Sequence, residues 1–304
     1  MKEIDQTTFE AEVQEAGEDL SPACAGLLFA REIAYPRLRP SDYLIRLDEL
    51  AAAARSFLAH HARPAARGLA LADFLFHSGD FRGDYGAGGR EMGGYETGGR
   101  ETGGYETGGR ETRPYDPRNA YLNEVLDRRR GLPISLSVIY LEVGRRLGLP
   151  VEGVGLPGHF IVSVEGEDGP IYLDPFHSGN RLAEDDCARL VRSTSGYEGA
   201  FDRRWLWPTG PRDIVARMLN NLRNFYVLVE DWPLAVKVVE RLRELQPHAA
   251  AHLRDLGLLH YRAGALRTAT QFLEAYLAQQ PDASDFDTVR QSRDLLLEHL
   301  ARLN

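Results

Sequence analysis

Residues 136–173 restrict the possible folds more than any other part of the chain. Residues 136–147 predict a helix that is apolar on most faces, and such a helix has to be buried. The turn signal Glu167-Asp168-Gly169 then separates two β-type segments, which predicts a hairpin. The expected strands are 151–155, 160–164 and 171–173. A buried helix followed by an antiparallel meander predicts an α+β core.

Local signals mark the ends of the expected helices. Ser135 is positioned to cap the buried helix, because a side-chain oxygen before a helix accepts hydrogen bonds from otherwise unpaired amides. Gly148 suits the residue after that helix, and Pro150 prevents its continuation. A further helix is expected over 119–130, so the basic run Arg128-Arg129-Arg130 would be a solvated helix end favoured by the helix dipole.

The N-terminal part of the chain, residues 1–82, predicts a helical subdomain. Its apolar residues recur at three- and four-residue steps between 20 and 76. Ser21-Pro22 and Ser41-Asp42 are expected helix starts, since each pairs a capping hydroxyl with a residue that suits a first turn.

Residues 83–113 have a different character. The ten-residue unit Gly-Gly-Tyr-Glu-Thr-Gly-Gly-Arg-Glu-Thr occurs twice in full and is preceded by a degraded copy. Glycine pairs make ordering costly in entropy, and the absence of aliphatic residues leaves nothing to offset that cost. We therefore expect a disordered insertion, which separates the helical subdomain from the core at 114–210.

The C-terminal part, residues 211–304, predicts helical repeats. Leu222 and Leu256, Ala235 and Ala269, Val238 and Phe272, and Pro247 and Pro281 correspond at an offset of 34 residues. That offset is the tetratricopeptide period, in which small residues stand where paired helices cross. Gly257 and Tyr261 also fit the pattern, whereas Arg223 and Val227 at the equivalent positions do not.

Composition excludes several classes of function. The formal net charge of -9 argues against a nucleic-acid partner, because such surfaces need clustered lysine and arginine. No segment has the apolar length of a membrane span, and the first residues lack a signal region, so a cytoplasmic protein without a membrane partner is expected. Cys24 and Cys187 form neither a disulfide framework nor a zinc-ligand spacing.

Two polar residues stand at the edges of expected strands, His159 in Leu-Pro-Gly-His-Phe-Ile-Val and Asp174 in Tyr-Leu-Asp-Pro-Phe. One hairpin turn between them can bring the two side chains onto neighbouring strands. A carboxylate that orients an imidazole is the arrangement with which acyl-transfer enzymes activate a nucleophile. Taken singly, each residue is better explained by a role in a turn at the end of a strand.

The order of these segments resembles the transglutaminase-like superfamily, in which a buried helix precedes a histidine strand and an aspartate strand. The stretch from Asn119 to Ser137, Asn-Ala-Tyr-Leu-Asn-Glu-Val-Leu-Asp-Arg-Arg-Arg-Gly-Leu-Pro-Ile-Ser-Leu-Ser, is similar to bacterial SirB-type proteins. The resemblance implies a papain-like core joined to a tetratricopeptide tail. It assigns His159 and Asp174 to the family's catalytic pair.

The family's cysteine nucleophile does not carry over to this chain. Its place at the start of the buried helix corresponds to Pro133, and Ser135 is the nearby hydroxyl. We therefore expect a protein-interaction or regulatory module with a protein or peptide partner. The alternatives are a hydrolase or acyltransferase that uses Ser135, His159 and Asp174, or a ligand-binding module in the remaining cleft.

No cofactor and no metal is expected. His177 follows Asp174 by three residues and could form a metal site with His159 and Asp174. The sequence shows no further ligand for such a site. Asp185-Asp186 is better explained as the start of a helix, where acidic side chains meet the positive end of the dipole.

The Gly-rich segment generates a first prediction. Deletion of residues 83–113 should leave the melting temperature nearly unchanged, because the closure entropy of a flexible loop grows only slowly with its length. Differential scanning calorimetry of the deleted and the intact chain checks this. A melting temperature lowered by many degrees would show that the segment stabilises the fold.

Overall fold

The computed structural model describes residues 4–85 and 115–303, which fall into two compact units. The first unit contains residues 4–85 and 115–221, and the second contains residues 222–303. The expected insertion at 83–113 therefore lies almost entirely outside the described residues. In the described part of the chain, no helix has the length and apolar character needed to cross a membrane.

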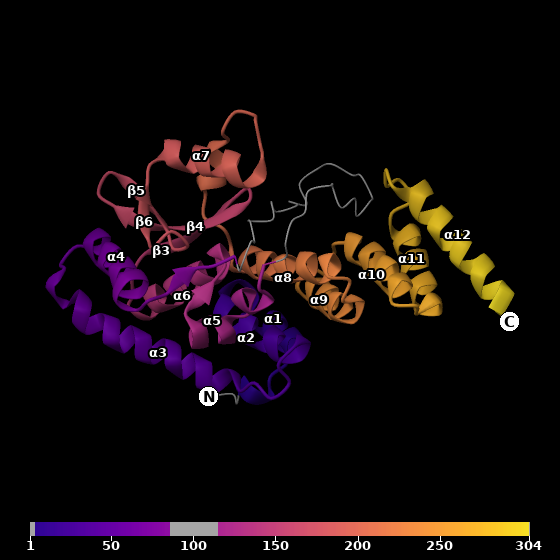
Figure 1. Ribbon diagram of the computed structural model, residues 1–304, viewed down its shortest axis with the longest axis horizontal. Helices are drawn as coiled ribbons and strands as arrows, with labels where there is room; N and C mark the ends of the chain where they lie inside the picture. Colours follow the sequence, from indigo (N-terminus) through magenta and orange to yellow (C-terminus); the bar gives the residue numbers. More distant parts are fainter. Residues whose placement is uncertain (1–3, 86–114, 304) are drawn as a thin grey trace. The chain divides into compact units, whose positions relative to one another are not determined.

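The N-terminal segment is helical (Figure 1). Its α-helices are α1 (Phe9–Ala16), α2 (Pro22–Ile33), α3 (Pro40–Phe57) and α4 (Pro64–Asp73). Its shorter helical turns are η1 (Ile4–Gln6), η2 (Gly17–Asp19), η3 (Leu58–His60) and the π-helical η4 (Phe74–Ser78).

Of the two expected helix starts, one is confirmed. The Ser21 hydroxyl accepts a hydrogen bond from the Cys24 amide at 3.2 Å, and Pro22 takes the first helical position. The expected start at Ser41 is wrong, because α3 begins one residue earlier at Pro40. The Ser41 hydroxyl instead donates to Asp5 Oδ2 at 2.7 Å.

The core of the first unit is a small antiparallel sheet with helices around it. Its strands are β3 (Val151–Leu156), β4 (His159–Gly166), β5 (Gly169–Asp174) and β6 (Asn180–Leu182), in the order β3-β4-β5-β6. Its helices are η5 (Pro117–Ala120), α5 (Leu122–Arg128), α6 (Pro133–Arg146), α7 (Glu184–Ser195) and η6 (Arg203–Leu206). The expected meander and the α+β class are confirmed.

Both faces of the sheet are covered. Figure 1 shows α7 on one side, and α4 and α6 on the other. The first side holds a cluster of buried apolar residues: Val154, Leu156, Ile161, Cys187 and Val191. Asp185 and Asp186 lie in the first turn of α7, as expected from the sequence.

The helix expected over 119–130 is shorter than the sequence predicts. Helix α5 ends at Arg128, and Arg129 adopts the left-handed conformation with φ 55°. Residues Arg130–Gly131 then form β2, which pairs in parallel with β1 (Arg82–Gly83). The Asp84 amide donates to the Gly131 carbonyl at 3.1 Å. Deletion of residues 83–113 would remove this pairing, so the melting-temperature test requires a deletion that begins at Gly86, which preserves it.

Helix α6 is buried on nearly every side, as the sequence predicts. Its fully enclosed side chains include Leu136, Val138, Ile139, Tyr140 and Val143. The expected start near Ser135 is wrong, because the helix begins at Pro133 after the N-cap residue Leu132. Ser135 therefore lies inside the first turn and cannot act as the cap.

Glu142 is a charged residue of α6 that is buried together with the apolar side chains of this helix. Its carboxylate accepts a hydrogen bond from the Ser21 hydroxyl at 2.7 Å and forms ion pairs with Arg145 at 3.0 Å and Arg146 at 2.5 Å. Burial raises the pKa of Glu142, but these partners outweigh burial and lower the pKa overall. The side chain thus joins the start of α2 to the end of α6.

The second unit consists of antiparallel helices. It contains residues 222–228 of α8 (Pro211–Leu228), followed by α9 (Trp232–Leu245), α10 (Ala251–Arg262), α11 (Leu266–Gln279) and α12 (Phe286–Leu303). Helices α9 and α11 begin and end at the offset of 34 residues seen in the sequence. Ala235 and Ala269 are both fully buried, as the close crossing of paired helices requires.

A second prediction follows from Glu142. Its replacement by alanine should lower the free energy of unfolding by about 3 kcal/mol, because Arg146 and the Ser21 hydroxyl would lose a buried partner. Urea denaturation of the full chain measures the difference. The matched control is Glu49→Ala at an exposed position of α3, which should stay within about 0.5 kcal/mol of the wild type. Equal effects of the two substitutions would contradict the structural role of Glu142.

Candidate functional site

The β3–β4 hairpin positions His159. Leu156 pairs with His159 across the hairpin, so Pro157 and Gly158 form a two-residue turn. Gly158 has φ +73°, which favours glycine. A β-carbon at this position would also lie 2.7 Å from Thr194 Oγ1 at the end of α7. The Leu-Pro-Gly-His sequence is therefore required for a tight turn that packs against a helix.

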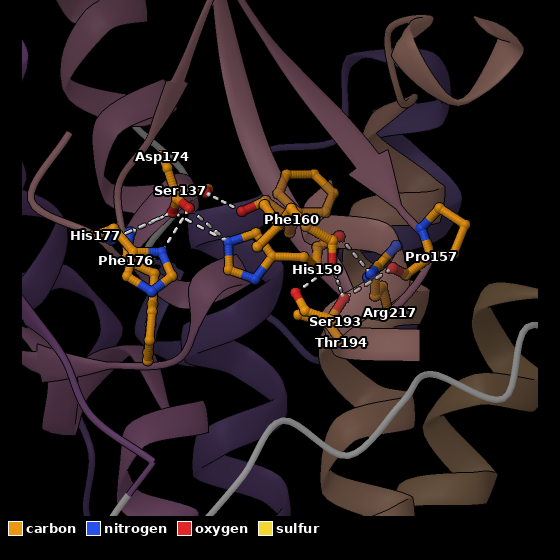
Figure 2. Close-up of polar contacts among 11 residues, drawn as sticks. Ser137, Pro157, His159, Phe160, Asp174, Phe176, His177, Ser193, Thr194 and Arg217 are labelled. Carbon is orange, nitrogen blue, oxygen red and sulfur yellow. Dashed lines mark hydrogen bonds and ion pairs between the residues drawn. The ribbon is translucent and has the colours of Figure 1, made fainter. Parts of the chain in front are cut away.

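Arg217 of α8 holds both ends of this turn. Its Nη2 donates to the carbonyl oxygens of Leu156 and His159, each at 2.6 Å. Its guanidinium also lies over the Phe160 ring, 5.5 Å from the centroid. Figure 2 shows Arg217 beside the backbone of His159. Arg217 is thus a positioning residue for the histidine.

His159 and Asp174 are brought together by the sheet. His159 begins β4 and Asp174 ends β5, two antiparallel neighbours. His159 Nε2 lies 3.0 Å from Asp174 Oδ2 and 3.1 Å from Oδ1, and both side chains are buried. The imidazole thus faces a carboxylate, as in the orienting pair of an acyl-transfer site.

His177 forms a second contact with the same carboxylate (Figure 2). Its Nδ1 lies 2.7 Å from Asp174 Oδ2, while its side chain is 53% exposed. Asp174 Oδ1 accepts hydrogen bonds from the backbone amides of Phe176 at 3.0 Å and His177 at 3.3 Å. Oδ1 therefore accepts from the two loop amides and also contacts His159, whereas Oδ2 contacts both imidazoles.

The electrostatic balance keeps Asp174 ionised. Burial raises the pKa of its carboxyl, but hydrogen bonds from His159 and His177 outweigh burial and hold the pKa well below its usual range. Asp174 is consequently an acceptor of hydrogen bonds and a source of negative charge at neutral pH.

Ser135 makes its hydrogen bonds elsewhere. Its hydroxyl donates to the Asn119 carbonyl at 2.7 Å and contacts the Leu132 carbonyl at 3.1 Å. A β-carbon at Gly131 would lie 2.8 Å from Ser135 Oγ, so glycine is needed for the chain to pass this close. The geometry commits the hydroxyl to the backbone that precedes α6. A catalytic role for Ser135, His159 or Asp174 remains a prediction.

The two cysteines are buried and free, in helices α2 and α7. Burial is the main cause that raises the pKa of Cys187, to about 12, and burial also raises the pKa of the Cys24 thiol. At neutral pH both are thiols and not thiolates, so neither is an activated nucleophile.

Two residues of this site had no clear sequence signal for their roles. Arg217 belongs to an amphipathic helix with other arginines, and nothing in its spacing marks the carbonyl oxygens that it binds. The spacing of three residues in the sequence made His177 a candidate neighbour of Asp174. Its contact with the carboxylate depends on the loop that follows β5. The Asp-Pro-Phe-His sequence shows only that such a contact is sterically possible.

Comparison with known proteins agrees with the two parts of the chain. A family model described as the transglutaminase-like superfamily matches residues 104–220. A tetratricopeptide repeat model matches residues 222–293. No solved structure gives a significant match to this chain.

Curated relatives share part of this sequence. A UPF0162 protein of Xylella fastidiosa is 40% identical over 179 residues, which is 58% of this chain and 64% of the relative. A UPF0162 protein of Pseudomonas aeruginosa is 36% identical over 45% of this chain and 50% of its own length. F-box only protein 21 of Mus musculus is 40% identical over 85 residues, 25% of this chain and 14% of that protein. The chain thus spans less than two thirds of each of these relatives.

A third prediction concerns the pH dependence of stability. The folded Asp174 stays ionised below its ordinary pKa of 3.8, whereas the unfolded chain takes up a proton there. Stability from this group is therefore present above about pH 4 and lost as the pH falls toward about pH 2. Asp174→Asn should cost about 1–3 kcal/mol at neutral pH and flatten this acid dependence.

Urea midpoints of the wild type and the variant between pH 5 and about pH 2 measure this difference. Asp168→Asn, at an exposed position in the β4–β5 turn, is the matched control and should retain the wild-type slope. An Asp174→Asn variant with an unchanged slope would show that the carboxylate is not stabilised as the contacts indicate.

Proposed function

We infer that this chain is a transglutaminase-like domain without a working nucleophile, joined to tetratricopeptide helices and acting as a protein-interaction or regulatory module. The SirB-type architecture indicated by the stretch from Asn119 to Ser137 is part of this proposal. The two matched family models support the combination of domains.

The hydrogen bonding of Ser135 carries the proposal. In the superfamily the start of the buried helix supplies the attacking sulfur, but here that position is Pro133. A serine nucleophile has to give its proton to the imidazole, whereas the Ser135 hydroxyl donates to the Asn119 carbonyl at 2.7 Å. The nearby hydroxyl is thereby used to hold the first turn of α6.

Asn119 explains why this hydroxyl is needed for structure. The Asn119 side chain is fully buried, and its Nδ2 donates to the Asp84 carbonyl at 2.7 Å while its Oδ1 accepts from Arg128 at 3.1 Å. Its carbonyl accepts from the Leu132 amide at 3.0 Å in addition to Ser135. The residues that carry the family resemblance therefore form a buried hydrogen-bond network around Asn119 at the start of α6. This network favours a structural role for these residues.

The helices of the second unit supply the binding surface in this proposal. Tetratricopeptide helices stack into extended concave surfaces that bind protein segments. Tyr261 of α10 is 48% exposed, and Leu295 of α12 is 67% exposed. Exposed aromatic and large apolar side chains are common at the centres of protein interfaces. A protein or peptide segment is the class of partner that fits these properties.

The rival function is a serine hydrolase or acyltransferase, and it is favoured by the short contact between His159 and Asp174. Labelling with a fluorophosphonate probe separates the two proposals. We expect no labelling of Ser135 in the native chain, because its hydroxyl donates to the Asn119 carbonyl and not to an imidazole. Intact-mass spectrometry checks this, with an active serine hydrolase in the same tube as the positive control.

Site-directed variants make the result specific. His159→Ala should lower the free energy of unfolding by about 1–3 kcal/mol, because a buried polar partner is lost, and should leave the absence of labelling unchanged. Labelling of Ser135 that disappears in a folded His159→Ala variant would reject the proposal in favour of the hydrolase.

The interaction part of the proposal has its own test. Cross-linking of the full chain in native cell extract should give a discrete partner whose cross-links map to residues 222–303. Tyr261→Glu should reduce recovery of that partner at least about tenfold, since interface aromatics carry much of the binding energy. His248→Ala, at another exposed position of the same unit, is the control. Equal recovery with both variants would contradict this role for Tyr261.

A further inference from the structure

We propose that His159, Asp174 and His177 form a binding site for a divalent transition metal ion of the zinc class. Each residue offers one ligand atom, and these atoms all lie within 4.8 Å of one another. Two imidazole nitrogens and one carboxylate oxygen are the ligand set that zinc takes at open sites with three protein ligands. The sequence contains these residues without showing that they converge.

Convergence on a single oxygen is the central observation. Asp174 Oδ2 lies 3.0 Å from His159 Nε2 and 2.7 Å from His177 Nδ1. Without a metal, both contacts are hydrogen bonds that use imidazole protons. A metal ion bound by the three atoms takes the place of these protons, and each neutral imidazole then carries its proton on its other ring nitrogen.

The required movement is small. Zinc–nitrogen bonds of about 2.0–2.1 Å in tetrahedral geometry place two ligand nitrogens about 3.4 Å apart. The two histidine nitrogens are at most 4.8 Å apart, so closure by at most about 1.4 Å is enough. The half-exposed His177 side chain is the one with room to move, whereas His159 is enclosed.

The carboxylate is held in an orientation that suits metal binding. The backbone amides of Phe176 and His177 donate to Asp174 Oδ1, which fixes the carboxylate so that Oδ2 faces both imidazoles. Outer hydrogen bonds of this kind orient metal ligands and raise affinity.

The loop after β5 fixes the position of His177. The Gly179 amide donates to the Asp174 carbonyl at 2.7 Å, and the Asn180 amide donates to the His177 carbonyl at 3.2 Å. Ser178 and Gly179 both have positive φ, at 60° and 72°, so the chain turns back sharply. The second histidine is thus supplied by a closed loop and not by a free segment.

Exposure of His177 determines the type of site. A structural zinc ion is enclosed by four protein ligands, whereas a site with three ligands keeps a position for water or another ligand. Because His177 reaches solvent while His159 and Asp174 are buried, the open position would face the solvent side. The geometry therefore fits an accessible, exchangeable metal ion.

The test uses the full chain without a histidine tag. After dialysis against a chelator, titration with zinc chloride in a calorimeter should give one saturable site. Cobalt(II) should give visible absorption bands of an ion in four or five coordination. His177→Ala should weaken zinc binding at least about tenfold and abolish the cobalt bands.

A matched control separates this site from incidental binding. His61→Ala, at an exposed position outside the cluster, should bind zinc as the wild type does. His177→Ala should fold normally, because its side chain is half exposed, and its melting temperature checks this. The proposal is overturned if the wild type binds no zinc, or if His177→Ala and His61→Ala bind it equally well. Such a failure would leave the proposed interaction function untouched, since neither probe labelling nor partner capture depends on metal.

Discussion

Burial of helix α6 is the constraint on which the first unit depends. A helix that is apolar on nearly all faces is stable in water only when other elements surround it, and α6 contacts α3, β3 and β4 and also α2 and α4. The N-terminal helices therefore complete the core and are not an appendage. Glu142 extends the same principle to a charge, because its burial is tolerated only with Ser21, Arg145 and Arg146 beside it.

The candidate site depends indirectly on the packing of α6, because α6 supports the strands that carry the site residues. Its two buried residues stand at strand ends, and the strands are held between α6 with α4 and α7. Arg217 and Gly158 restrict the hairpin from which His159 projects. The result is a buried imidazole and a buried carboxylate with a more exposed second imidazole beside them.

Sequence reasoning succeeded where one short segment decides the structure. The hairpin at Glu167-Asp168-Gly169, the cap at Ser21 and the repeat offset that relates α9 to α11 were all predicted, because each depends on neighbouring residues or on periodicity. It failed at Ser41 and Ser135, where a proline one or two residues earlier began the helix. Both prolines suit the first helical position better than a serine suits the second or third.

Local sequence patterns were enough to predict the α+β core, the repeat helices and a histidine and an aspartate at strand edges. The contacts of these polar groups depend on tertiary packing. The Ser135 hydroxyl binds a carbonyl 16 residues earlier in the chain, and Arg217 binds one 58 residues earlier. Helix and strand patterns report which face of an element is buried, but they do not specify which distant donor meets which acceptor. That pairing, and with it the convergence of His159 and His177 on one oxygen of Asp174, arises only when the elements pack.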